Sequence, residues 1–225
     1  MMKFGILLGV FLVFSQTSGE FCYDDVKGAC GSKPITIEGP LLANCNAKYG
    51  KFKELQPDLQ AYADDHIETS FEFLLMSTHF GNYEMNRDGF KGLFRKLSDK
   101  HWNKAIDIIK FITKRGGRMN FNQQPRFEQK ANDSTLSLNE LNSLAKALDT
   151  SKRLADEALR IHTTAQHHKS MDASVAHYIE EEFLEDQAET VRTLAGHTSD
   201  FKGFLADRDS SLFVFLFDEY FKKTL

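Results

Sequence analysis

The chain has 225 residues, of which 41% are hydrophobic, and its net charge is −4 at pH 7. This length can bury one substantial core, so one main domain is expected. The charge is mild and the basic residues are scattered, which argues against nucleic acid or an anionic membrane as a partner.

Residues 1–19 have the layout of a cleaved secretory signal peptide. Lys3 precedes an apolar run at residues 4–14, and small residues at 17–19 offer a cleavage site, expected after Gly19 with Ser18 as the alternative. The apolar run is short for a membrane span, and no later segment approaches that length. We therefore expect a soluble mature chain in the endoplasmic reticulum, the Golgi or outside the cell.

Residues 20–56 form an N-terminal arm that holds all three cysteines. In an oxidising compartment, three thiols can form one internal bridge and leave one over. Cys22 and Cys30 are the nearest pair, so we expect a bridge between them. Cys45 is then a free, half-buried thiol or, as we predict, a bridge to another subunit. The spacing does not fit a zinc site.

Two helical patterns follow each other in residues 59–118. The first is expected from Pro57 to about Phe80, and the second from residues 86–88 to about Arg115, where two glycines end it. Steps of three and four place His66 and His101 on the core-facing lines of these helices. The apolar stripes are wide and the linking segment is short, so antiparallel helices in a bundle are expected.

Residues 120–135 are polar and lack sustained periodicity, so they predict a long connection that crosses the bundle. Asn132 lies in the chain's one Asn-x-Ser/Thr sequence and is a candidate for glycosylation, which the sequence leaves open. Beyond it, apolar spacing between Leu138 and His162 predicts a third helix, which ends in the polar run at residues 166–172. A fourth helix is marked by Val175, Ile179, Phe183, Val191 and Leu194.

Residues 209–211 cap a short fifth helix at residues 212–221, which is apolar on nearly every side. Such a helix must be buried, and we expect it to pack against copies of itself at a symmetry axis. The predicted fold class is therefore all-α, with four bundled helices, a long crossover and a short fifth helix in residues 57–225.

Several sequence features together resemble ferritin. They are the segment Ser-Phe-Glu-Phe-Leu-Leu-Met-Ser-Thr-His-Phe at residues 70–80, Arg-Gly-Gly-Arg at 115–118, and Leu-Phe-Asp at 216–218. Their order and the four helices agree with the family from about Leu59 onward. The leader and the cysteines resemble the secreted ferritins of insects. The resemblance implies a ferritin-like four-helix bundle with a fifth C-terminal helix.

In the family, a di-iron oxidation centre uses carboxylates from facing helices and a Glu-x-x-His pair. This chain contains no Glu-x-x-His or Asp-x-x-His. Aligning on Phe80 and Arg115 places residues that differ from the family's ligands at four of the five ligand positions. The fifth residue, Gln187, matches its counterpart. In order, the five are His66, His101, Lys104, Ser151 and Gln187. The resemblance therefore implies a light-type subunit that is no enzyme and holds no tightly bound metal.

The two histidines allow two interpretations. They are either satisfied core histidines or a residual metal site, for which two imidazoles favour zinc or copper over iron. Lys104 argues against the metal, because it places an ammonium where a cation would bind.

The family's three-fold channel corresponds here to His162, His177 and Glu180, of which His177 replaces a carboxylate. Cation passage would then depend on histidine protonation, unless these are ordinary surface histidines. The family's mineral-nucleating glutamates are not carried over. Glu182 and Asp186 are the candidates for a mineral-facing surface, although a solvated charged face is the commoner meaning of such a run.

The resemblance implies iron storage as the function. The expected partners are a heavy-type subunit and copies of this chain in a hetero-oligomer of 24 subunits, with iron ions stored as ferric mineral and no catalytic cofactor. A competing class is a secreted monomeric bundle that carries lipid or signals, which would elute near the mass of one chain. A third is an active ferroxidase with relocated ligands, against which the missing Glu-x-x-His argues.

Overall fold

The computed structural model describes residues 21–22, 26, 44–121, 139–167, 169, 171–205 and 210–224. The expected signal peptide, Cys30 and Asn132 lie outside these residues. The chain divides into two compact units, Met1–Asn46 and Ala47–Leu225. Every regular element in the described part of the second unit is helical, which agrees with the all-α prediction.

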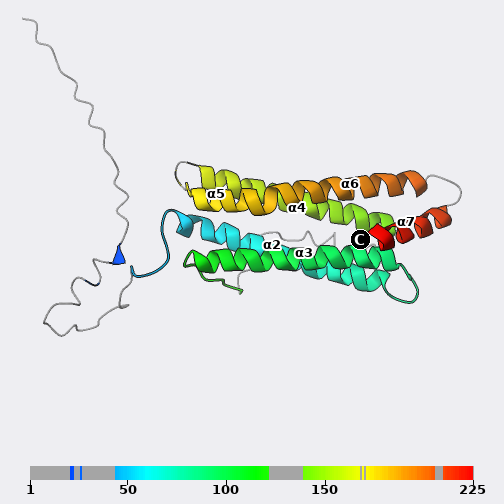
Figure 1. The fold of residues 1–225 in the computed structure, drawn as a ribbon, viewed down its shortest axis with the longest axis horizontal. Coiled ribbons are helices and arrows are strands. Elements are labelled where there is room, and N and C mark those ends of the chain that lie inside the picture. The colour runs from blue at the N-terminus through cyan, green and yellow to red at the C-terminus, as the bar shows by residue number, and fades with distance from the viewer. Residues whose placement is uncertain are drawn as a thin grey trace, which may run out of the picture. The chain divides into compact units, whose positions relative to one another are not determined.

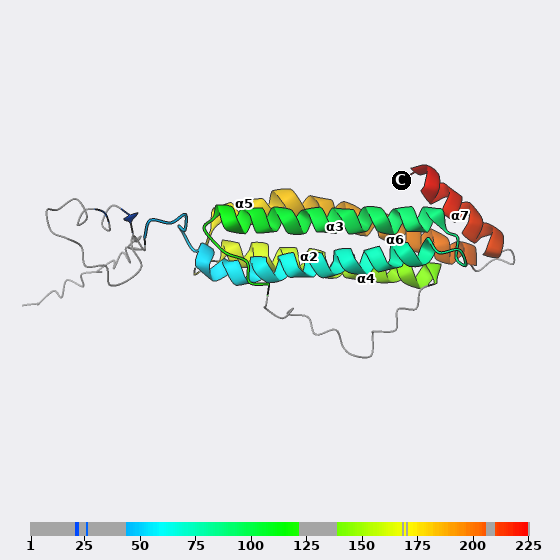
Figure 2. The same cartoon turned by 90° about the horizontal axis from the view of Figure 1, so that it is seen from below.

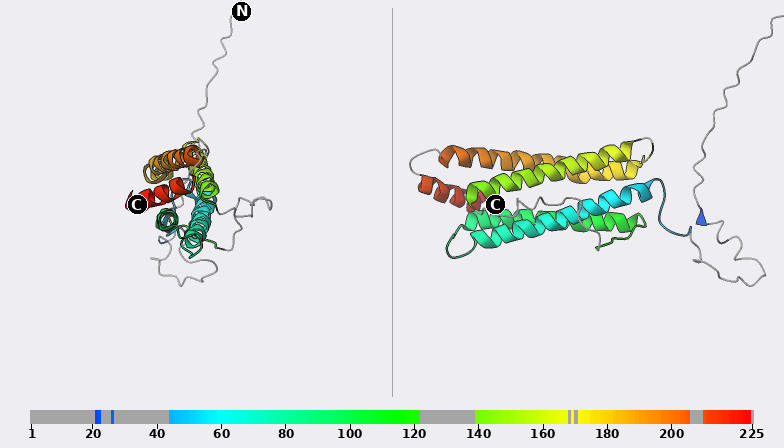
Figure 3. Two further views of the ribbon diagram at one scale, coloured as in Figure 1. Left: turned by 90° about the vertical axis from the view of Figure 1, so that its right-hand side faces the viewer. Right: turned by 180° about the vertical axis from the view of Figure 1, so that it is seen from behind.

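Four long helical segments form the bundle in the second unit. α2 (Phe52–Phe80) and α3 (Asp88–Lys114) run antiparallel, and α4 (Glu140–Gln166) lies along the fourth helix. The fourth helix consists of α5 (Ala173–Ile179), a π-helical turn η1 (Glu180–Leu184) and α6 (Glu185–Leu205). Figures 1 and 2 show the four rods side by side, and Figure 3 shows them end-on.

The first helix starts earlier than the sequence predicted. It begins at Phe52, so Pro57 lies inside it and not at its first turn. Phe52 and Leu55 are fully buried with Leu59. Burying two such side chains contributes about 3–6 kcal/mol, which outweighs the roughly 3 kcal/mol that an interior proline costs a helix. The bounds of α3 agree with the prediction.

Arg115, the first residue of the Arg-Gly-Gly-Arg sequence, ties three parts of the unit together. Its guanidinium donates two hydrogen bonds to the carboxylate of Asp172, at 3.2 and 2.8 Å, and one to the carbonyl of Tyr49 at 3.1 Å. Asp172 also caps α5 by accepting from the amide of Val175. Both charged side chains are buried, so this pair fixes the end of α3 against the start of α5.

The core consists of two apolar clusters. One is built around Phe52, Leu59, Ile108 and Ile161, and the other around Phe73, Phe90, Leu194 and Phe217. On each of the four helices, the buried residues between the two clusters are mostly polar. We call these the central polar layer, which consists of His66, Thr69, Ser70, Ser98, His101, Thr150, Ser151, Gln187 and Thr190.

The fifth helix, α7 (Ser210–Thr224), lies at one end of the bundle and packs on α3. Asp218 accepts hydrogen bonds from the amides of Gly89 and Phe90, both at 3.0 Å, and so caps α3 from outside. Phe217 and Phe221 are buried, whereas Leu212, Phe215 and Leu216 are about half exposed. The packing of the exposed side at a symmetry axis stays a prediction.

The disulfide prediction was wrong. In the first compact unit, Cys22 pairs with Cys45, which rules out both the bridge from Cys22 to Cys30 and a link from Cys45 to another subunit. Nearness in sequence was a weak criterion because loop-closure entropy grows slowly with length. Closing 23 residues in place of 8 costs only about 1 kcal/mol more. Separately, no helix in the described part of the chain is long and apolar enough to cross a membrane.

We expect Asp218→Ala to detach α7 from α3. The substitution leaves the amides of Gly89 and Phe90 without their acceptor, at a cost of about 1–3 kcal/mol. Hydrogen exchange at these two amides should accelerate. Glu219→Ala is the control, because its carboxylate contacts only Lys222 among the described ion pairs. Unchanged exchange in Asp218→Ala would show that the cap does not hold α7.

Candidate functional site

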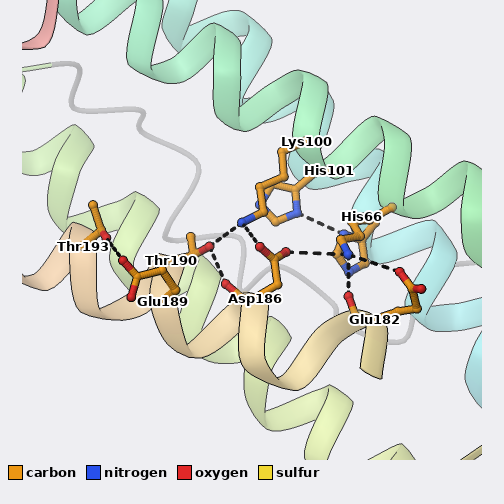
Figure 4. Close-up of polar contacts among 9 residues, drawn as sticks. His66, Lys100, His101, Glu182, Asp186, Glu189, Thr190 and Thr193 are labelled. Atoms are coloured by element: carbon orange, nitrogen blue, oxygen red, sulfur yellow. Dashed lines mark hydrogen bonds and ion pairs between the residues drawn. The ribbon is translucent and has the colours of Figure 1, made fainter. Parts of the chain in front are cut away.

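Two histidines from facing helices form the middle of the central polar layer. His66 on α2 and His101 on α3 are 0% and 1% exposed, and their Nδ1 atoms are 3.0 Å apart. Figure 4 shows the two rings pointing toward one another. Aromatic rings surround them, with Tyr62 at 4.6 Å from His66 and Phe73 at 5.5 Å from His101 between ring centroids. The two imidazoles are therefore shielded from water and lie against aromatic rings within the polar layer.

Burial keeps both imidazoles uncharged. Desolvation lowers the pKa of His101 to about 3, and nearby lysines contribute to the shift. The pKa of His66 is lowered well below its usual value, first by desolvation and then by His101 and the lysines. Two neutral rings place one proton between their Nδ1 atoms. One ring therefore donates its Nδ1–H, and the Nδ1 of the other ring accepts it. This geometry favours the interpretation as core histidines, which share one hydrogen bond, while the Nε2 atom of each ring makes none in the structure.

Two lysines of α3 pair with carboxylates of the fourth helix. The Lys100 ammonium lies 2.7 Å from Asp186 Oδ1 and donates to the Thr190 hydroxyl at 2.6 Å. The Lys104 ammonium lies 3.8 Å from both Glu182 Oε2 and Asp186 Oδ2. It also donates to the backbone carbonyl of Glu182. The candidate mineral-facing carboxylates are therefore already balanced by two internal cations.

The remaining positions that the sequence singled out carry uncharged groups. Ser151 on α4 is fully buried, and its hydroxyl makes no hydrogen bond in the structure. Gln187 lies next to the hydroxyl of Tyr62, whose pKa is raised by desolvation and lowered in part by this amide. The five positions that the sequence singled out thus supply two neutral imidazoles, an ammonium, a hydroxyl and an amide. No carboxylate is among them.

This set does not fit a pair of iron ions. Ferrous and ferric iron in such centres are held by anionic oxygen ligands, and none of the five positions provides one. Within the described ranges, no group of three or more His, Cys, Asp or Glu is arranged to hold a metal. Lys100 and Lys104, whose charges contribute to the lowered pKa of both histidines, would also repel a metal cation there.

A second group lies where α4 ends and the fourth helix begins. His162 Nε2 is 3.6 Å from Glu180 Oε2 and 3.3 Å from the amide of Gln166. His177 points to a different carboxylate, with its Nε2 3.1 Å from Glu181. The structure therefore brings together two of the three residues expected at the channel, and it adds Glu181 as the partner of the third.

Comparison with known proteins decides the family. The sequence model of the family Ferritin, described as a ferritin-like domain, matches residues 58–204 of this chain. This chain belongs to the ferritin family. It is 46% identical to a ferritin light chain of Trichoplusia ni, over 95% of this chain and 94% of that one. It is 38% identical to a ferritin light chain of Drosophila melanogaster, over 99% and 100% of the two chains.

A solved structure agrees with this assignment. The crystal structure of Trichoplusia ni secreted ferritin has a TM-score of 0.83 with this chain at 46% identity, and it covers 92% of this chain and 100% of its own. The four-helix bundle with a short fifth helix is therefore the ferritin fold. Iron storage follows as the function of this ferritin chain.

Sequence reasoning missed the role of Lys100 and the carbonyl of Glu182 in this ferritin chain. A signal was present, because Lys100 and Lys104 on one helix have the same four-residue spacing as Glu182 and Asp186 on the other. Two pairs of opposite charge at equal spacing can form a ladder between neighbouring helices. Nothing in the sequence pointed to the backbone carbonyl.

The histidine pair should make this ferritin chain less stable in acid. The unfolded chain binds protons at His66 and His101 below pH 6.5, whereas the folded chain does not, so the free energy of unfolding falls with falling pH. The expected loss is up to about 1.4 kcal/mol per pH unit for each histidine. A His66→Leu/His101→Leu variant, compared with wild type by urea denaturation at pH 7, 6 and 5, should lack this contribution. If the free energy of unfolding changes with pH in the same way in the variant and in wild type, the two histidines are not a neutral pair.

Proposed function

We propose that this ferritin chain is the light-type, non-catalytic subunit of a secreted shell of 24 subunits. In this shell, a heavy-type partner oxidises ferrous iron, and both subunits enclose the ferric mineral. The observation that carries the proposal is the Lys104 ammonium, which the carboxylates of Glu182 and Asp186 hold beside the histidine pair. A fixed internal cation takes the place that an iron ion would need.

The chemistry of iron oxidation supports this assignment. Two ferrous ions must be held within reach of one oxygen molecule, which requires several anionic ligands to offset four positive charges. The site offers two neutral imidazoles and two ammonium groups, and its nearest carboxylates already form ion pairs. No step of iron oxidation can be assigned to these residues. The two similar chains named ferritin light chain support the same conclusion.

The exposed side of α7 supports assembly. Leu212, Phe215 and Leu216 leave an apolar face half exposed on a single chain, and burial against other subunits would remove it from water. The alternative of a monomeric carrier or signalling bundle is not supported, because the chain belongs to the ferritin family. The expected N-terminal signal peptide and the similarity to a secreted ferritin support passage through the endoplasmic reticulum and Golgi and export.

The proposal extends to the channel and to the mineral surface. His162 with Glu180, and His177 with Glu181, would line the path of cations at the three-fold axis, and protonated histidines would slow entry. Glu182 and Asp186 would face the mineral only if iron displaces the lysines that balance them. Asn132 stays a candidate for glycosylation, and the proposed arm, expected over residues 20–56, ends before α2 begins at Phe52.

Shells made of this chain alone should oxidise ferrous iron no faster than buffer does, because the ligand positions lack carboxylates. Stopped-flow absorbance after mixing ferrous iron with the homopolymer measures this. Adding a catalytic heavy-type subunit to the assembly is the positive control and should restore rapid oxidation. A fast, saturable phase in the homopolymer would mean that other residues bind and oxidise iron.

Leu216→Lys should prevent complete shells from forming. The substitution adds a charge to the apolar face of α7, which would be buried without a partner at the expected axis. Native mass measurement of the assembled protein is the test. Tyr83→Lys is the matched control, because its side chain is 89% exposed in the turn after α2. Full shells of unchanged thermal stability in Leu216→Lys would show that α7 is not buried there.

A further inference from the structure

The buried residues of the fourth helix are spaced too widely for a regular α-helix. Val175, Ile179, Phe183 and Gln187 are all buried, at three successive steps of four residues. Three α-helical turns span about 10.8 residues, so twelve residues overrun the buried face by about one. The π-helical turn Glu180–Leu184 takes up this extra residue and keeps both halves of the helix facing the core.

A side chain from another helix reaches into this turn. The wider turn loosens the regular hydrogen-bond ladder, so an outside donor can reach a carbonyl within it. Lys104 on α3 donates to the carbonyl of Glu182, and its ammonium lies 5.0 Å from the centre of the Phe183 ring. The same ammonium pairs with the carboxylates of Glu182 and Asp186, one inside the turn and one just beyond it.

We infer that Lys104 is a latch that holds the π-helical turn and thereby fixes the register of the fourth helix. This role is separate from the exclusion of iron and holds in the iron-free protein. The latch explains why one lysine contacts the turn in three ways: through the carbonyl of Glu182, through the carboxylate of Glu182 and through the ring face of Phe183. Lys100, four residues earlier, contacts Asp186 and Thr190 beyond the turn and none of the residues within it.

The register matters because the residues on both sides of the turn face defined neighbours. Phe183 lies 5.3 Å from Tyr62 and 5.7 Å from His66 between ring centroids. At the start of the turn, Glu180 faces His162. If the extra residue moved along the helix, the residues it passed would rotate by about 100° each, which would turn Phe183 or Gln187 away from the core. Introducing a carboxylate by Lys104→Glu would therefore disrupt the turn before it could build a metal site.

A double-mutant cycle in the iron-free protein tests the latch. The variants are Lys104→Met, a deletion of the exposed Glu181 that removes the extra residue, and the two combined. Hydrogen exchange of the segment at residues 180–188 is the readout. Lys104→Met should accelerate exchange at least tenfold in the full-length chain. In the deletion, where the turn can become regular α-helix, the same substitution should have little effect, so the two changes should be strongly non-additive.

Lys100→Met is the matched control, since it removes a neighbouring ammonium but no contact with the turn. It should leave exchange at residues 180–184 within about twofold of wild type, and Lys104→Arg, which can still donate, should retain most of the protection. Equal effects of Lys104→Met in both backgrounds would overturn the inference. If the deletion does not fold, equal exchange in Lys104→Met and Lys100→Met would overturn it as well.

Discussion

The hydrogen bond between His66 and His101 sets the conditions for the whole centre of the bundle. Two imidazoles that face each other in a dry aromatic environment must stay neutral, because neither ring can be solvated when charged. A neutral pair can share one proton and needs no counterion. The centre therefore requires no anionic side chain from α4. Because both imidazoles are neutral, Ser151 at this level of α4 leaves no histidine charge unpaired.

The lysines complete this arrangement at the surface of the same layer. Their ammonium groups lie outside the buried pair, where carboxylates of the fourth helix balance them and water still reaches them. In a catalytic ferritin centre, metal ions would link the helices at this level. Here Lys100 and Lys104 link α3 to the fourth helix, so the bundle is joined across its middle without a bound metal.

Periodicity predicted the elements whose burial follows a regular stripe, such as α3 and α4, and it placed His66 and His101 on the core. It failed where tertiary contacts overrule local preference. The start of α2 depends on the burial of Phe52 and Leu55, which together offset the cost of Pro57, and the pairing of Cys22 with Cys45 depends on how the arm folds. The only sign of the π-helical turn was the four-residue spacing of Val175, Ile179 and Phe183, and the prediction treated the whole segment as one helix.

We propose that lysine ammonium groups lie beside the histidine pair at the level where a catalytic subunit would hold iron. Crystals of the assembled protein soaked anaerobically with ferrous iron, measured at the iron absorption edge, test it most directly. The account predicts no anomalous peak within coordination distance of His66 and His101, and Lys104 in contact with Glu182 and Asp186 as before. An iron peak at the histidine pair, with Lys104 turned away, would contradict it.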